Sequence, residues 1–272
     1  MAHPLAPAGR DCLPLVFAHR GGRALGPENT LAALDLGLAA GADGLEFDVR
    51  ISSDGVPVLH HDPDLDRCTG AQGPVEARTA AELARVDAAY WFDEAHGYPL
   101  RDRGICVPTL ADALARYTGP PLIVEIKVGA ADAARRVVQA VRDAGAVQRV
   151  CIGSFSLVAL QTVRALEPRI PTSAARQEGQ WSLYRSWLGL PLGRTPYRGF
   201  QVPERSGRLK VVSRRFIRSA HRAGLPVQVW TVNEEPDMWR LLEWGADALI
   251  SDRPDLAARV RDAWAAAGRP HA

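Results

Sequence analysis

Three carboxylates in the sequence stand where they could bind a metal ion together. Glu46 and Asp48 are two positions apart in a short apolar run, and Glu125 comes near the end of another. If both runs are strands, side chains two positions apart share a face. Glu46 and Asp48 then point one way, as do Glu125 and Lys127, while Phe47 and Ile126 point the other way.

Carboxylates that converge at one place repel one another, which raises their pKa values and destabilises the fold. A divalent cation that prefers oxygen ligands removes this repulsion. We therefore expect Glu46, Asp48 and Glu125 to hold one divalent cation. The alternative is that each carboxylate pairs with a nearby arginine or lysine.

A predicted hairpin brings a histidine to the same place. Asp54–Gly55 stands between two extended runs, and this pair is typical of a two-residue hairpin turn. That turn would place Asp48 opposite His61, and the residue after Asp48 opposite His60. His61 is thus predicted beside the cation, while His60 points to the other face and is interpreted as structural.

The run from His19 to Gly22, His-Arg-Gly-Gly, follows the first apolar stretch. Glycines let the backbone approach an anion closely, and the arginine fork matches phosphate oxygens. Together with a metal site and a second histidine, His19 and Arg20 favour attack at phosphorus with proton transfer on both sides.

Short apolar runs alternate with helical patterns along most of the chain, which predicts repeated strand–helix units and a parallel sheet. The predicted strands are 15–19, 44–50, 121–127, 149–153, 170–175, 198–202, 226–231 and 247–251. The predicted helices are 29–40, 109–117, 131–145, 156–166, 213–223, 235–244 and 254–266. Eight strands favour an α/β fold of the TIM (β/α)8 barrel type over an open doubly wound sheet. In such a barrel the polar residues at the carboxyl ends of the strands form the active site.

Two stretches do not fit the repeat. Residues 51–108, between the second and third strands, contain the hairpin, a polar loop and a short helix predicted over 79–88. We interpret 62–108 as a small insertion in a single domain that spans 15–266. The other stretch, 177–198, combines aromatic residues with glycines and prolines.

Composition excludes several classes of protein. The formal charge of +2 is too small to indicate a nucleic-acid partner. Met1–Pro14 does not resemble a secretory signal, and no apolar run is long enough for a membrane helix. The four cysteines are not spaced like a metal site or a disulfide framework, which favours free thiols and a cytoplasmic location.

In its ordered motifs, the chain resembles the glycerophosphodiester phosphodiesterase family over roughly 15–256. The motifs are His19-Arg20-Gly21-Gly22, Pro27-Glu28-Asn29-Thr30, Glu46-Phe47-Asp48-Val49, Asp54-Gly55-Val56-Pro57-Val58, His61-Asp62, Pro108-Thr109-Leu110, Glu125-Ile126-Lys127, Ser154-Phe155, Trp230-Thr231-Val232-Asn233, Gly245-Ala246-Asp247 and Ser251-Asp252-Arg253-Pro254. Ser251 departs mildly from the pattern, because the family more often has threonine there.

The resemblance implies a TIM barrel with an insertion after the second strand. It also implies a metal-dependent hydrolase that converts small-molecule glycerophosphodiesters to glycerol 3-phosphate and an alcohol, in glycerol and lipid metabolism. Position by position, the resemblance implies that Glu46, Asp48 and Glu125 bind one Mg²⁺ or Ca²⁺. It implies that His19 and His61 are the general acid and the general base, in an order left open. It also implies that Arg20 and Lys127 contact the phosphate and that Trp230 lines the glycerol side of the substrate site.

Other functions stay open at this point. A lysophospholipase D could use the same site on lysophospholipids. A non-catalytic phosphate-binding barrel and a phospholipase C-type lyase are disfavoured by the retained histidines and carboxylates. The segment 181–188 would place Trp181, Tyr184 and Leu188 on one helical stripe, which either packs on the barrel or contacts a membrane or lysolipid. The oligomeric state is not indicated.

Two polar positions have a structural interpretation as well. Asn29 or Thr30 is expected to cap the first helix. Asp252 is expected to cap the helix that follows the last strand.

Overall fold

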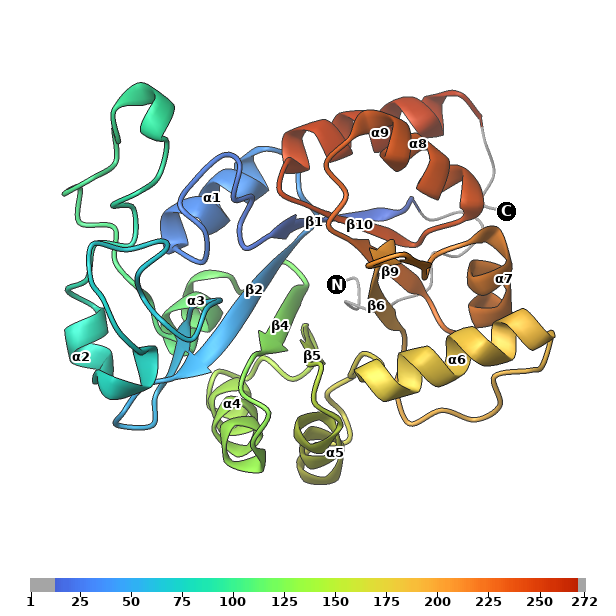
Figure 1. Ribbon diagram of the computed structural model, residues 1–272, viewed down its shortest axis with the longest axis horizontal. Coiled ribbons are helices and arrows are strands. Elements are labelled where there is room, and N and C mark those ends of the chain that lie inside the picture. Colours follow the sequence, from blue (N-terminus) through green and yellow to red (C-terminus); the bar gives the residue numbers. More distant parts are fainter. Residues whose placement is uncertain (1–12, 269–272) are drawn as a thin grey trace.

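The structure of the protein is a computed structural model, which describes residues 13–268 of the chain. Within these residues, parallel strands follow the order β5-β4-β2-β1-β10-β9-β6 around a central axis (Figure 1). The strands are β1 (Leu15–His19), β2 (Gly44–Ile51), β4 (Leu122–Ile126), β5 (Val150–Gly153), β6 (Phe200–Pro203), β9 (Val227–Trp230) and β10 (Ala248–Ser251). The strands form a nearly closed barrel, which confirms the predicted TIM-barrel class.

The parallel strands occupy every barrel position except the fifth in chain order, which lies between β5 and β6 and contains no regular strand. The strand expected over 170–175 is reduced to two isolated parallel bridges, from Thr172 to Ile152 of β5 and from Ser173 to Gly199 just before β6. Pro171 accepts a hydrogen bond from the Ile152 N–H but has no N–H of its own, which limits pairing here. The two bridges nevertheless fill the gap between β5 and β6.

Helices cover the outside of the strands, as Figure 1 shows. They are α1 (Leu31–Ala39), α3 (Leu110–Arg116), α4 (Ala131–Asp143), α5 (Leu157–Leu166), α6 (Arg176–Leu188), α7 (Arg214–Arg222), α8 (Glu235–Trp244) and α9 (Pro254–Ala266). None of the helices within residues 13–268 is long and apolar enough to cross a membrane.

Side chains alternate along the barrel strands as predicted. Phe47 and Ile126 point outward into the core that they share with Val137 and Val141 of α4. Burying each such side chain stabilises the fold by roughly 1.5–3 kcal/mol relative to exposure. The opposite, inward-facing set of these strands includes the three carboxylates.

An apolar layer fills the inside of the barrel below the site. Phe17, Ile123, Ala248 and Ile250 form this cluster, with Trp230 packed against it. Phe17 and Ile123 stand two positions before His19 and Glu125, on the same inward faces. In β1 and β4 the apolar layer is therefore followed by polar residues, His19 and Glu125, near the carboxyl end of the strand.

The segment after β2 extends from one side of the barrel (Figure 1). It contains β3 (Pro57–Leu59), η1 (Val75–Ala77), α2 (Ala80–Leu83) and η2 (Glu94–His96). The helix expected over 79–88 is much shorter than predicted, although Thr79 caps it in a capping box. Its small core consists of Val58, Leu65, Val75, Leu83, Ala88 and Val107. The single-domain interpretation of 15–266, with the insertion at about 62–108, stays a prediction.

The predicted hairpin register is wrong by one residue. Val49 pairs with Leu59, and the His60 N–H donates to the carbonyl of Asp48, so Asp48 lies opposite His60 rather than His61. The turn contains three residues instead of two and ends at Gly55, which has a φ of +82°. A left-handed residue at that position is typical of three-residue hairpin loops.

The segment 177–198 is not an exception to the strand–helix repeat, contrary to the sequence-based prediction. Its first half belongs entirely to α6, which stands in the fifth helical position and lies crosswise to α4 and α5 in Figure 1. A regular apolar stripe facing the core was missing from the sequence because several large apolar side chains of α6 face solvent.

Cys68, Cys106 and Cys151 are free thiols, as predicted for these positions. Cys12 and most of the segment Met1–Pro14 lie outside the described residues.

Candidate active site and metal centre

Three carboxylates converge at the carboxyl end of neighbouring strands. One ligand oxygen of each of Glu46, Asp48 and Glu125 lies within 4.8 Å of the others. Asp48 of β2 is paired in register with Glu125 of β4, and Glu46 stands two positions earlier on the same face. The structure therefore confirms the prediction that the side chains of all three carboxylates point into the barrel.

Lys127 and Arg20 lie among these carboxylates. Lys127 Nζ is 2.8 Å from Glu125 Oε1 and 3.0 Å from Asp48 Oδ1, and Arg20 Nε is 3.2 Å from Asp48 Oδ2. The alternative interpretation, in which basic side chains neutralise the carboxylates, is thus partly realised. A single ammonium and an arginine cannot balance the site, because Arg20 also pairs with Glu28.

Burial and mutual repulsion shift the pKa values of the three carboxyls. Burial, followed by the charge of Asp48, raises the pKa of Glu46 from 4.5 to about 7. Burial also raises the pKa of Glu125, against the lowering effect of Lys127. Burial would raise the pKa of Asp48 too, but Lys127 and Arg20 outweigh it and the net shift is downward.

Two buried oxygens test whether the residues fit a divalent cation. Asp48 Oδ1 and Glu125 Oε1 are buried oxygens left without a well-formed hydrogen bond, and each has the Lys127 ammonium as its ion-pair partner, at 3.0 and 2.8 Å. Buried oxygens without a hydrogen bond are costly. An all-carboxylate set with two such oxygens suits a hard divalent cation of the Mg²⁺ or Ca²⁺ type.

His19 stands at the end of β1 beside the carboxylates. Its Nε2 is 3.9 Å from Glu46 Oε2, and its Nδ1 forms a 2.6 Å hydrogen bond with Asp252 Oδ1. Burial lowers the pKa of His19, but the hydrogen bond with Asp252 and the charge of Glu46 outweigh burial, so the net shift is upward. Asp252 in turn accepts a hydrogen bond from Asn233.

His61 reaches the site from the loop after β3, even though its register is shifted. Its Nδ1 forms a 2.6 Å hydrogen bond with Asp62 Oδ1. Burial lowers the pKa of His61, and the nearby charge of Asp48 opposes this. His60 is buried, and its Nε2 bonds the carbonyl of Asp64, in keeping with a structural role.

A chain of ion pairs joins the two ends of the site. Arg20 Nη1 donates to Glu28 Oε1 at 2.8 Å, and Arg67 donates to both oxygens of Glu28 at 2.7 and 2.9 Å. Arg67 Nε also donates to Asp62, the partner of His61. Because Arg67 is half-exposed, its ion pairs contribute little to the free energy of folding. They nevertheless hold Glu28 and Asp62 in place relative to each other.

The loop after β1 depends on glycine and asparagine. Gly21 has a φ of +85°, and a Cβ there would lie 2.7 Å from the backbone of Ala33. Asn29 also has positive φ; its side chain donates to Asp48 Oδ2 and accepts from the Asp48 N–H. Thr30 caps α1, so the structure separates the two capping candidates.

The expected cap role of Asp252 is wrong. Arg253 occupies the N-cap of α9, with no capping side chain, and Asp252 is bound to His19 and Asn233 instead. Sequence spacing did not indicate this, because His19 and Asp252 are joined only by the pairing of β1 with β10.

An aromatic pair lies at the carboxyl ends of β9 and β5. The rings of Trp230 and Phe155 meet edge to face, with centroids 6.0 Å apart. Phe155 is half-exposed. Together they offer an apolar wall, while the predicted contact of Trp230 with the glycerol side stays a prediction.

The model of the glycerophosphoryl diester phosphodiesterase family matches residues 19–256. A glycerophosphodiester phosphodiesterase of Caldanaerobacter subterraneus is 28% identical over 250 residues, which is 89% of this chain and 95% of the relative. The glycerophosphoryl diester phosphodiesterase domain of a Mycobacterium tuberculosis protein superposes with a TM-score of 0.79 and 25% identity, over 91% of this chain and 99% of that one.

A phosphodiesterase of Oleispira antarctica, solved with its product sn-glycerol 3-phosphate, is also similar. Its TM-score is 0.74 and its identity 27%, over 92% of this chain and 97% of that chain.

Proposed function

Since the chain belongs to the glycerophosphoryl diester phosphodiesterase family and is therefore a phosphoric diester hydrolase, we propose that it carries out metal-dependent hydrolysis of glycerophosphodiesters to glycerol 3-phosphate and an alcohol. The observation that carries the proposal is the convergence of Glu46, Asp48 and Glu125 beside His19. The product bound to the Oleispira antarctica relative supports glycerol 3-phosphate as the product class.

In this proposal Glu46, Asp48 and Glu125 hold one Mg²⁺ or Ca²⁺. When bound, the cation neutralises the carboxylates and withdraws charge from the phosphodiester. Arg20 and Lys127 contact phosphate oxygens. Arg20 keeps Nη2 for this purpose, since its side-chain contacts with Asp48 and Glu28 use Nε and Nη1.

His19 and His61 move the protons. One histidine accepts a proton from water as the water oxygen forms its bond to phosphorus. The other donates a proton to the alcohol oxygen as its bond to phosphorus breaks. Asp252 and Asp62 each engage Nδ1 of one histidine, which leaves both Nε2 atoms for these transfers. Which histidine is the acid stays open, because both are held in the same way.

The test is an assay of glycerophosphocholine beside a lysophospholipid, with and without EDTA. We expect choline and glycerol 3-phosphate as products, loss of turnover with chelator, and recovery with Mg²⁺ or Ca²⁺. Full turnover after metal removal verified by elemental analysis would contradict the metal role. Release of phosphocholine and glycerol would contradict the proposed bond cleavage.

Nothing in the site favours a lysophospholipid over a soluble diester, so lysophospholipase D activity is not our proposal. We do propose peripheral contact of segment 181–188 with an anionic membrane surface. Trp181 is 63% exposed and Leu188 74%, and Tyr184 and Trp187 are also exposed. The cytoplasmic location and the role in lipid and glycerol metabolism stay predictions.

A further inference from the structure

A cavity of about 550 Å³ lies at the opposite end of the barrel from the carboxylates. Its lining comes mainly from three segments, 168–172, 193–198 and 223–225. Segment 168–172 leads into the strand position between β5 and β6 that holds only isolated bridges. Segment 193–198 leads into β6, and segment 223–225 leads into β9. Segments that lead into barrel strands lie at their amino ends, so the cavity is separate from the candidate active site.

Fixed side chains form two of its walls. Arg164 donates to both oxygens of Glu178 at 2.7 and 3.0 Å and to Thr172 Oγ1 at 2.8 Å. Tyr197 is 4% exposed, and its hydroxyl lies 2.7 Å from Ser182 Oγ. The charge of Arg164 is therefore compensated, and neither wall needs to rearrange for a ligand to enter.

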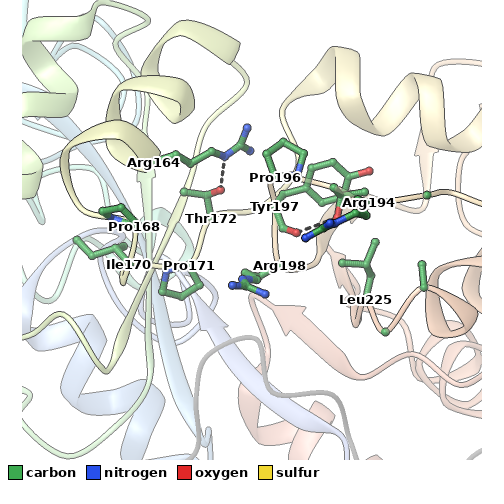
Figure 2. Close-up of a pocket in the computed structure, with 14 residues that line it drawn as sticks. Arg164, Pro168, Ile170, Pro171, Thr172, Arg194, Pro196, Tyr197, Arg198 and Leu225 are labelled. Atoms are coloured by element: carbon green, nitrogen blue, oxygen red, sulfur yellow. Dashed lines mark hydrogen bonds between the residues drawn. The ribbon is translucent and has the colours of Figure 1, made fainter.

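Arg194 and Arg198 supply an uncompensated charge. Both line the cavity, both are exposed, and no carboxylate of the described residues forms an ion pair with either. No acidic residue lines the cavity within the described part of the chain. Figure 2 shows the two side chains between Pro171 on one side and Leu225 on the other.

We propose that this cavity binds a phosphate monoester through Arg194 and Arg198. Two guanidinium groups match the charge of a phosphate monoester, about −1.5 to −2 at pH 7, better than that of a carboxylate. Pro168, Pro171 and Leu225 provide an apolar wall for the organic part of the ligand. The cavity volume is in the range of small-molecule sites, roughly 300–1,000 Å³.

Phosphate monoesters reach the protein from two sources. One is its own reaction, because glycerol 3-phosphate is a phosphate monoester. The other is a larger metabolite with a ring, for which adenosine 5′-monophosphate is a probe. Both sources share the recognised group and differ in how much apolar wall they cover.

The experiment is calorimetric titration of the full chain in Mg²⁺ with sn-glycerol 3-phosphate and, separately, with adenosine 5′-monophosphate. The test variant is Arg194→Gln with Arg198→Gln. The matched control is Arg85→Gln with Arg208→Gln, which removes the same charge from exposed positions outside the cavity. Hydrolysis of glycerophosphocholine is measured on all three proteins.

For at least one of the two ligands, the parent and the control variant should bind at a site for which the test variant has an affinity at least about tenfold lower, or no measurable affinity. Hydrolysis should stay within about twofold for all three, because the catalytic end is untouched. Loss for glycerol 3-phosphate identifies the product as ligand; loss for the nucleotide alone identifies a ring-bearing metabolite. Equal binding by test variant and control, or benzoate competing as well as the monoester, would overturn the proposal.

Discussion

Asp252 positions His19 through a single short hydrogen bond, and this contact has a measurable signature. A carboxylate beside an imidazole favours its protonated form. We predict that Asp252→Asn lowers kcat about 10-fold or more and lowers the pKa of His19, because the hydrogen bond and charge of Asp252 both raise it.

The measurement is an NMR titration of His19 together with the pH–rate profile. Asp255→Asn is the matched control, since Asp255 pairs with Arg253 outside the site. A lower rate with an unchanged His19 pKa would show that Asp252 acts only on local folding.

Glu46 links metal binding to pH. Its pKa is raised in the folded protein to about 7, above its ordinary value of 4.5. The folded state therefore binds the extra proton, so this group adds stability below pH 4.5 that is lost as pH rises through 7. The cation needs the ionised carboxylate, so its stabilising effect should grow over the same range.

We predict that saturating Mg²⁺ or Ca²⁺ raises Tm by about 5–10 °C at pH 8 and by little at pH 5.5. Scanning calorimetry at several pH values checks this. Glu46→Gln should abolish the metal effect and raise the metal-free Tm at pH 8. A metal-induced shift that is equal at both pH values would contradict the assignment.

The roles of His19 and His61 can be separated through the leaving group. Losing the general acid matters less when the departing alcohol is acidic, as p-nitrophenol is. We predict that one of His19→Ala and His61→Ala loses at least about 100-fold on glycerophosphocholine but recovers most turnover on a p-nitrophenyl diester. The other variant should be slow on both. Recovery by both variants, or by neither, would refute the acid–base pair.

At the scale of elements, the turn at Gly55 carries the loop that delivers His61. Gly55 has a φ of +82°, and an added Cβ would meet the guanidinium of Arg136, which donates to the Gly55 carbonyl. We predict that Gly55→Ala lowers the free energy of unfolding by about 1–2 kcal/mol and Tm by about 2–6 °C.

Thermal unfolding measures the loss, and Gly119→Ala is the control, because Gly119 lacks positive φ and has open space around it. An unchanged Tm for Gly55→Ala would mean that the turn adopts another conformation in solution.

The hairpin at Gly55 and the strands beside it show which features of the site could be predicted from the sequence. Alternating side chains predicted the inward direction of Glu46, Asp48 and Glu125, because period-two geometry is local. The hairpin register was wrong because one residue more in the turn shifts every later pair, and Asp54–Gly55 is compatible with both lengths. His61 still reaches the site, since it lies beyond the last residue of β3.

Partners that come together through long-range pairing could not be predicted. The contact of His19 with Asp252 requires β10 beside β1, and the link of Glu28 to Arg67 requires the fold of the insertion. Helix α6 was absent from the predicted helices for a different reason: the helical stripe of Trp181, Tyr184 and Leu188 faces solvent, whereas helices of a strand–helix repeat are predicted from a stripe that faces the core.

At the scale of the whole molecule, α6 presents the most apolar exposed face of the described residues. Trp181, Tyr184, Trp187 and Leu188 are each at least 42% exposed, and Leu190 continues the patch. Exposed apolar patches of this kind mark interaction sites, and tryptophan and tyrosine favour the membrane interface. The exposed Arg176 at the start of α6 adds positive charge, which suits anionic lipid.

We predict that the parent protein co-sediments with phosphatidylserine-containing vesicles and that Trp181→Ser with Trp187→Ser reduces this binding about tenfold or more. The control, Leu36→Ser with Val158→Ser, removes exposed apolar side chains from α1 and α5. Because these tryptophans are exposed, neither double variant should change Tm much or the hydrolysis of glycerophosphocholine. Vesicle binding that survives in the test variant, or equal loss in both, would mean that α6 is not the membrane contact. A large fall in Tm for the test variant alone would mean that its aromatic side chains pack in the folded protein.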